Sequence, residues 1–351
     1  SPGHADDESA GARATARELG IEHRVLELAG DHSPDIARLT AAFAEPFACD
    51  SALGMLSVSE TIAGAGIKVL LTGDGGDDVF LGYPRHRHLR AAQLLAALTP
   101  SAAAEIWSQL RPQDPRRARG QRAVHFLDYA TGGLPAFLDA HEGLPEFARR
   151  GILGERLQNV RVSTRGRPWS SASARRLLSD YLAHDWQSQF VSEYLTKVDG
   201  ATMYHALEAR SPLLDQELWE WAASLPLAHR MRGWRLKSIL RDIAARRVSR
   251  RLATLPKKGF GVPVLSWLGA HRQKITAQYL RDSMLAAGGW IQVEPLLREL
   301  EELPPGRQVS RQLWYAVVLE SWMRAERDAR RQPLADAVGS EDTDHRAVAA
   351  R

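Results

Sequence analysis

A glycine-rich acidic segment, Thr72-Gly73-Asp74-Gly75-Gly76-Asp77-Asp78, holds the residues of this 351-residue chain whose types and spacing best suit chemistry. Three glycines allow the backbone to approach a ligand closely and to turn successive N–H groups into one concavity. Three carboxylates within five residues repel one another unless a cation, usually Mg²⁺, lies between them. A ligand that carries phosphate together with Mg²⁺ would use both features.

Other types of loop explain this segment less well. A Walker A loop needs Gly-Lys followed by Ser or Thr, which the segment lacks. An EF-hand counted from Asp74 would need a bidentate Glu where Arg85 stands. A calcium-binding nonapeptide array would need repeats, and there is one copy. A solvated acidic turn remains an alternative, because Gly and Asp are common in turns.

A second candidate is a cluster of basic residues, Arg232, Arg235 and Lys237, at the start of a predicted helix over 236–248. The helix dipole disfavours each cation there by ~0.3–1 kcal/mol. An anion bound at the same helix end would reverse that penalty. The alternative is a solvated basic face. A further basic loop with glycines covers 257–263 and could equally be a plain turn.

A third candidate lies upstream of that cluster, where Glu208 and Arg210 stand among apolar residues. The favoured interpretation is a buried structural pair, with a functional pair as the alternative. Asp215 is expected to cap the helix predicted over 215–225.

The elements that must position these residues change in kind along the chain. Up to about residue 80, helical patterns alternate with short apolar runs, which is typical of a βαβ unit in a parallel α/β sheet. The strand over 67–72 is expected to be buried, and ligands bind at the carboxyl ends of such strands. In this part we predict helices over 7–19, 34–43 and 51–65 and strands over 21–28 and 67–72.

Beyond residue 84 the strand signals nearly vanish, and helical patterns dominate. The expected organisation is an α/β sheet region over 1–84, a mainly helical remainder over 85–330 and a disordered tail over 331–351. The helices predicted in this half cover 86–98, 101–110, 173–194, 215–225 and 236–248.

Composition excludes several classes of protein. Hydrophobic residues make up 44% and charged residues 25%, as in ordinary globular domains, and no run of 18 apolar residues predicts a membrane span. Cys49 is the single cysteine, which excludes a disulfide framework and a cysteine-built metal site. Basic residues lie beside acidic ones, so no nucleic-acid partner is expected. The acidic first residues are not a signal peptide, and a reducing cytoplasm is the expected location.

Taken together, these segments resemble the C-terminal synthetase domain of glutamine-hydrolysing asparagine synthetases, over roughly residues 1–270. The resemblance implies a parallel sheet flanked by helices of the ATP pyrophosphatase type, which is adenine nucleotide alpha hydrolase-like. It rests on matching motifs at 7–8 with 19–23, at 69–83, at 207–215, at 237–241 and at 256–263.

The resemblance also implies roles for particular residues. Thr72 and Gly73 would contact ATP, and Asp77 would bind Mg²⁺–pyrophosphate. Asp74 occupies the position of an acidic side chain tied to adenylate formation and to deprotonation of the incoming amine. Lys237 matches a lysine that stabilises phosphate charge in the transition state. Near the start of the chain, Pro2 matches a position where the backbone meets the adenine.

The sequence also departs from that family's pattern. The phosphate loop Ser-Gly-Gly-Leu-Asp-Ser-Ser and the glutaminase domain with its N-terminal Cys have no counterpart here. The chain therefore reads as a fragment of a longer enzyme that binds ATP poorly by itself. Ammonia would come from a glutaminase domain missing from this sequence. Gly200 and Asp78 replace a larger polar residue and a usual Glu, which leaves the substrate open.

The leading hypothesis is an ATP-dependent ligase that adenylates aspartate, releases pyrophosphate and lets ammonia form asparagine and AMP. ATP and Mg²⁺ are the expected cofactors. One alternative applies the same adenylation to another acid, as in lasso-peptide cyclases and β-lactam synthetases. Another is a degenerate, non-catalytic domain that binds a partner. The oligomeric state stays open, with a homodimer as one option.

Overall fold

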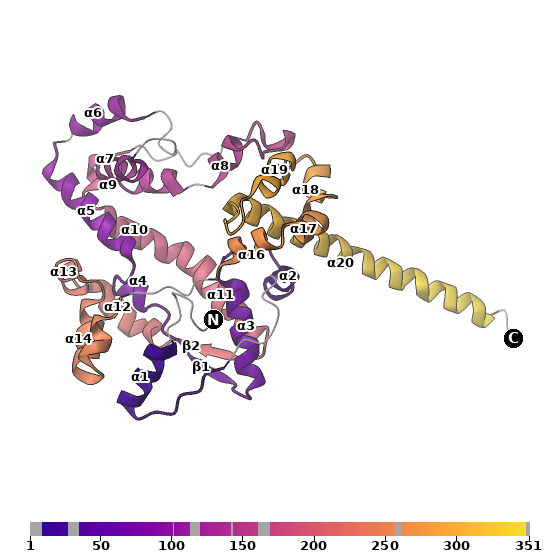
Figure 1. Cartoon of the computed structure of the whole chain (residues 1–351), viewed down its shortest axis with the longest axis horizontal. Helices are drawn as coiled ribbons and strands as arrows, with labels where there is room; N and C mark the ends of the chain where they lie inside the picture. Colours follow the sequence, from indigo (N-terminus) through magenta and orange to yellow (C-terminus); the bar gives the residue numbers. More distant parts are fainter. Residues whose placement is uncertain are drawn as a thin grey trace. The chain divides into compact units, whose positions relative to one another are not determined.

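The computed structural model describes the chain in seven stretches, which are residues 9–26, 35–100, 102–112, 120–141, 143–160, 169–256 and 262–348, the last with its backbone alone beyond residue 330 (Figure 1). Packing divides the chain into two compact units, each assembled from three segments. Unit 1 comprises Ser1–Leu28, Val58–Glu142 and Val162–Phe260, and unit 2 comprises Ala29–Ser57, Gly143–Arg161 and Gly261–Arg351. The predicted division at residue 84, by kind of secondary structure, stays a prediction.

Unit 1 is helix-rich and contains one small parallel sheet. Its elements are α1 (Ser9–Leu19), the later part of α3 (Ala52–Gly64), β1 (Val69–Leu71), α4 (Gly76–Val79), α5 (Pro84–Leu98), α6 (Ala102–Leu110), α7 (Gln121–His141), α9 (Ser171–Ala174), α10 (Leu177–Gln187), η2 (Phe190–Leu195), α11 (Thr196–Met203), β2 (Glu208–Arg210), η3 (Pro212–Leu214), α12 (Gln216–Ser224), α13 (Leu227–Arg230), α14 (Ser238–Arg247) and α15 (Arg250–Thr254).

The sheet of unit 1 consists of β1 and β2 in parallel, with Val69 opposite Glu208 and Leu71 opposite Arg210. The expected parallel α/β character is therefore confirmed. The expected burial of the strand at 67–72 is wrong, because Val69 and Leu71 are 45% and 70% exposed. A sheet of two short strands covers little apolar surface, so both side chains stay accessible within the described part of the chain.

The strand predicted over 21–28 is also absent: residues 21–26 adopt no strand, and the last two lie outside the described residues. Ile21 and Val25 are 58% and 50% exposed. The spacing of apolar residues over 21–28 resembles that of a strand, but no described strand lies beside this segment to supply hydrogen bonds. The predicted helix before this segment is confirmed as α1, and Gly20 ends it with φ +66°.

Two clusters of apolar side chains form the core of unit 1. The larger joins α5, α7 and α10, with Leu89, Leu177 and Leu178 fully buried. The smaller packs Val79 and Phe80, at the end of α4, against Ala222 of α12 and against side chains of α14. The second cluster fixes the segment that follows the glycine-rich loop.

Unit 2 is helical, and its described part is organised around α20. Trp314 of α20 is buried and donates its indole N–H to the carbonyl of Ala48 at 2.8 Å. Glu320, also buried, accepts the hydroxyl of Ser283 at 2.8 Å. The elements of this unit are α2 (Ala37–Phe43), the start of α3, α8 (Leu144–Arg149), η1 (Glu155–Leu157), α16 (Val264–Ala270), α17 (Arg272–Ile275), η4 (Thr276–Leu280), α18 (Met284–Ala287), α19 (Glu294–Glu302) and α20 (Arg311–Val348).

Most of the predicted helices are present with shifted ends. The helix predicted over 173–194 is divided into α9, α10 and the π-helical η2. α20 extends to Val348, and the predicted disordered tail from residue 331 stays a prediction. Among the helices that the structure describes, none is both long and apolar enough to cross a membrane.

Candidate active site

The glycine-rich loop begins where β1 ends, at the carboxyl edge of the sheet. The N–H of Thr72 donates to the carbonyl of Arg210 at 2.8 Å, and its hydroxyl is hydrogen-bonded to that of Ser211. The end of β2 therefore holds the first residue of the loop from both its backbone and its side chain. This placement agrees with the expected position of a ligand site at the end of a parallel strand.

The middle of the loop needs glycine for conformation and for space. Gly75 has φ +84° and precedes α4, a backbone conformation that favours glycine. A Cβ on Gly75 would collide with Leu214, and one on Gly76 would collide with Leu213. Residues after β2 thus press against the loop and keep it in one shape.

Asp77 and Lys237, predicted from separate motifs, form an ion pair in which Nζ lies 2.7 Å from Oδ1. Their side chains are 17% and 26% exposed, so the pair is accessible from one side only. Lys237 lies immediately before α14 in the left-handed conformation, with φ +52° and ψ +38°. That conformation is costly for a residue with a Cβ, and here it presents the ammonium group to the loop.

Gly82 makes this ion pair sterically possible. Its N–H donates to the carbonyl of Asp77 at 2.7 Å, so the backbone passes directly beneath the carboxylate. A Cβ at this position would overlap Oδ1 of Asp77 and crowd Cε of Lys237. Gly82 lies within the motif at 69–83, but no role at the site was predicted for it.

The other two basic residues of the predicted anion cluster behave differently. Arg232 pairs with Asp242 at 3.2 Å, and Arg235 pairs with the second oxygen of the same carboxylate. Asp242 lies in α14 and already neutralises the charge that an anion was expected to offset. Of the three, Lys237 alone joins the glycine-rich loop.

The remaining candidates have mixed outcomes. Asp74 is partly exposed, and no described residue hydrogen-bonds or ion-pairs with its carboxylate. Glu208 and Arg210 do pair, at 2.8 Å, but the expectation of burial is wrong because their side chains are 54% and 63% exposed. Asp215 caps α12 as predicted, accepting the N–H of Leu218 at 3.0 Å. Pro2 and most of the basic loop at 257–263 lie outside the described residues.

A buried polar network behind the loop was not predicted. Arg85 donates to the hydroxyls of Tyr181 and Tyr194, each at 3.0 Å, and Tyr181 donates to Asp185 at 3.0 Å. Burial raises the pKa of Asp185. Burial, followed by the charges of Asp185 and Asp77, raises the pKa of Asp78 to about 6. Asp78 and Asp185 thus lie in the interior behind the acidic loop, and burial makes both carboxyl groups harder to ionise.

A sequence signal for this network exists. Leu177, Leu178, Tyr181 and Leu182 are buried on one face of α10, and Asp185 occupies the next position of that stripe. A carboxylate in an apolar stripe is rare unless it has a buried partner. His86 of α5 is also fully buried, and burial lowers its pKa to about 3.

The acidic residues of the loop suit a Mg²⁺ ion that a phosphate ligand also coordinates better than a metal site built from protein ligands alone. Among the residues that the structure describes, no group of three or more His, Cys, Asp or Glu gathers around a point. Mg²⁺ is commonly bound by one or two carboxylates and completed by phosphate oxygens and water. Asp77 can supply one such carboxylate, with Lys237 beside it to contact the same phosphate group.

A glycine-rich loop at the end of a parallel strand, in which a loop carboxylate pairs with a lysine from another element, is typical of an α/β protein with a ligand site at the strand end. The sequence model of the asparagine synthase family matches residues 2–324, and the chain belongs to that family.

Its relatives carry two kinds of name. Asparagine synthetase [glutamine-hydrolyzing] 1 of Bacillus subtilis is 22% identical over 92% of this chain and 50% of its own length. A putative asparagine synthetase [glutamine-hydrolyzing] of Mycobacterium bovis is 26% identical over 89% of this chain and 47% of its own length. Amidase chyE of Penicillium rubens is 24% identical over 76% of this chain and 43% of its own length. The chain therefore spans about half the length of these relatives.

Proposed function

We propose that this chain is the synthetase part of an ATP-dependent, AMP-forming carbon–nitrogen ligase, with aspartate as acceptor acid, ammonia as nucleophile and asparagine as product. The observation that carries the proposal is the Asp77–Lys237 ion pair on a glycine-rich loop at the end of β1. Membership of the asparagine synthase family supports it.

Each residue of the site has a defined task in this reaction. Thr72 and Gly73 bind the nucleotide at the strand end. The ammonium of Lys237 neutralises charge that develops on the phosphates as the acceptor carboxylate displaces pyrophosphate from the α-phosphorus of ATP. Asp74, which pairs with no described residue, accepts the proton that ammonia loses when it attacks the acyl-adenylate. The carboxylate of Asp77 is the one to hold Mg²⁺, which would supply further positive charge at the phosphates.

The direct test is pyrophosphate release by the complete gene product with MgATP and ammonium, with and without L-aspartate. Release that depends on aspartate, with asparagine and AMP formed in equal amounts, supports the proposal. Lys237→Ala should remove that release while folding is retained, because the side chain lies outside the apolar core. Aspartate-dependent turnover that survives this substitution contradicts the proposed role of the lysine.

A second candidate applies the same adenylation to a different acid. Its support is that relatives named amidase match the chain as well as those named asparagine synthetase, at 24% against 22–26% identity. ATP cleavage that ignores aspartate but responds to a larger acid would favour this candidate. Absence of ATP cleavage with every acid would favour a non-catalytic domain.

A further inference from the structure

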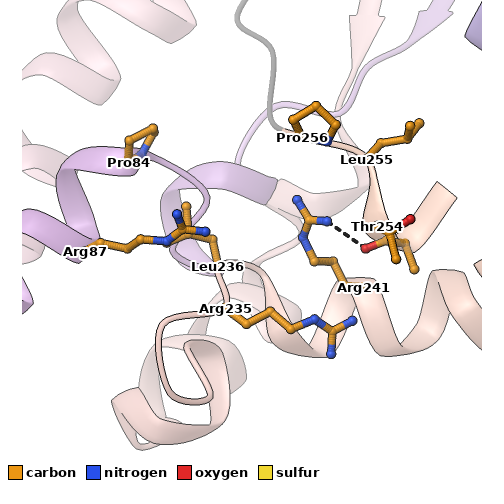
Figure 2. A pocket seen from close by; sticks show the side chains of 9 residues that line it. Pro84, Arg87, Arg235, Leu236, Arg241, Thr254, Leu255 and Pro256 are labelled. Atoms are coloured by element: carbon orange, nitrogen blue, oxygen red, sulfur yellow. Dashed lines mark hydrogen bonds between the residues drawn. The ribbon is translucent and has the colours of Figure 1, made fainter. Parts of the chain in front are cut away.

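A pocket of about 480 Å³ opens in unit 1 between the start of α5, the turn before α14 and the end of α15. We call it the arginine pocket, because Arg87, Arg235 and Arg241 line it (Figure 2). Lys237 directly follows two of its lining residues in the chain, so the pocket adjoins the loop site. No local sequence pattern groups these three arginines.

The charge in this pocket is poorly compensated. Arg235 is neutralised by Asp242, but within the described chain no carboxylate lies at ion-pair distance from Arg87 or Arg241. Arg241 donates one N–H to the carbonyl of Ala253 at 2.6 Å, and Figure 2 shows this hydrogen bond. Burial first, and then the charges of Arg235 and Arg87, lower the pKa of Arg241. A bound anion would relieve this repulsion.

The walls of the pocket are largely apolar. Pro84 and Leu236 contribute on one side, and Leu255 and Pro256 on the other (Figure 2). A volume of this size lies within the range that accommodates drug-sized ligands, roughly 300–1,000 Å³. A free amino acid would leave much of that apolar surface uncovered, so the pocket suits a larger ligand with both an anionic and an apolar part.

We propose that the arginine pocket binds the acceptor acid, and that this acid carries a second anionic group and an apolar portion besides the carboxylate to be activated. The inference rests on the adenylating ligase chemistry proposed above and favours its second candidate, in which the acceptor acid is larger than aspartate. Guanidinium groups recognise carboxylates through paired hydrogen bonds, and Arg87 and Arg241 are the two available for this.

The electrostatic surroundings connect the pocket to the reacting end of the site. Lys237 directly follows the pocket residues Arg235 and Leu236, and the charge of Asp77 acts on Arg241, where it opposes the effect of the two neighbouring arginines. In the proposed arrangement a ligand anchored by Arg87 and Arg241 therefore has its other carboxylate directed toward Lys237. This arrangement separates an anchoring carboxylate from the one that attacks ATP.

The test is calorimetric titration of the complete gene product, without ATP, using three probes: L-aspartyl-L-leucine, L-aspartate and inorganic pyrophosphate. The dipeptide should bind about tenfold or more tightly than aspartate, because its leucine side chain covers the apolar wall. Arg87→Ala should weaken the binding of both acids about tenfold, as expected for a lost charge-assisted contact. Leu255→Ser should reduce the advantage of the dipeptide and leave aspartate binding unchanged.

Arg122→Ala serves as the matched control, because Arg122 is an exposed arginine of α7 that does not line the pocket. Aspartate binding as tightly as the dipeptide, or none of the probes binding, would overturn the proposal. So would an Arg87→Ala effect confined to pyrophosphate, which would make the pocket a phosphate site. The titration contains no ATP, so it tests binding independently of the ligase reaction. If the ligase function fails, the dipeptide still binds in the titration, but the separate MgATP assay shows no pyrophosphate release.

Discussion

Two single substitutions of Lys237, to glycine and to alanine, separate the contribution of its charge from the contribution of its backbone conformation. Both Lys237→Gly and Lys237→Ala remove the ammonium group, but only glycine adopts φ +52° without a steric penalty. The left-handed conformation costs a residue with a Cβ ~1–2 kcal/mol. Glycine recovers that amount and loses ~0.5–1 kcal/mol to the greater entropy of its unfolded chain.

The ion pair that both variants lose is partly accessible, and such pairs contribute about 0–1 kcal/mol to stability. Lys237→Ala should therefore lower the free energy of unfolding by up to about 1 kcal/mol, since it keeps the backbone penalty of the wild type and loses the ion pair. Lys237→Gly should stay close to the wild-type stability. Pyrophosphate release should fall about 10²–10³-fold in both, because each lacks the same stabilising charge.

The measurements are urea unfolding and MgATP-dependent pyrophosphate release on the same preparations. Lys68→Ala is the control, since Lys68 is an exposed lysine just before β1. Equal stabilities of the alanine and glycine variants would refute the argument from backbone strain. More than half of wild-type activity in the glycine variant would refute the argument from charge.

Three further predictions concern the residues around this pair. Gly82→Ala should reduce pyrophosphate release at least tenfold and stability by ~1–3 kcal/mol through steric overlap with Asp77. Gly64→Ala, where no atom lies within 4 Å, should leave pyrophosphate release unchanged and should not lower stability in the same assays. Asp77→Asn should raise the Mg²⁺ concentration needed for half-maximal activity about tenfold, and an unchanged Mg²⁺ requirement would exclude this carboxylate as the metal ligand. The pKa of Asp78 is about 6 when folded, above its ordinary value of 3.8, so its ionisation destabilises the fold as pH rises between these values. Asp78→Asn should therefore gain up to about 3 kcal/mol relative to wild type between pH 4 and pH 7.5 in urea unfolding, and a pH-independent difference would contradict the buried ionisation.

Local patterns predicted most of the helices, the strand at 67–72 and the two motifs that meet at the site. They did not predict β2, the parallel partner of that strand. These features depend on periodicity, capping residues and glycines, all of which act over a few residues. Asp77 and Lys237 could each be proposed as site residues, from the elements beside them and from the family resemblance, but not as partners of one another. Their ion pair at 2.7 Å is a tertiary fact that no local pattern contained.

The predictions that were wrong concern features that depend on tertiary structure. Exposure of Val69 and of the Glu208–Arg210 pair depends on how many strands join the sheet, which alternation of residues does not encode. The ion pair between Arg235 and Asp242 depends on the side-chain rotamers that Asp242 can adopt within α14. The arginine pocket combines three segments that are distant in sequence, so its charge became visible only after folding.

The parallel pairing that shapes the loop has a consequence for the order in which the protein acquires its site. The hydroxyls of Thr72 and Ser211 meet across 139 residues of chain, and Lys237 follows later still. Ribosomes add roughly 5–20 residues per second, so the loop leaves the exit tunnel many seconds before its supports are made. Contacts of such separation form slowly because the intervening chain must first be closed into a loop. During synthesis the chain therefore completes its candidate site only after residue 237 has been made, and truncation before that residue should yield helices without the Asp77–Lys237 pair.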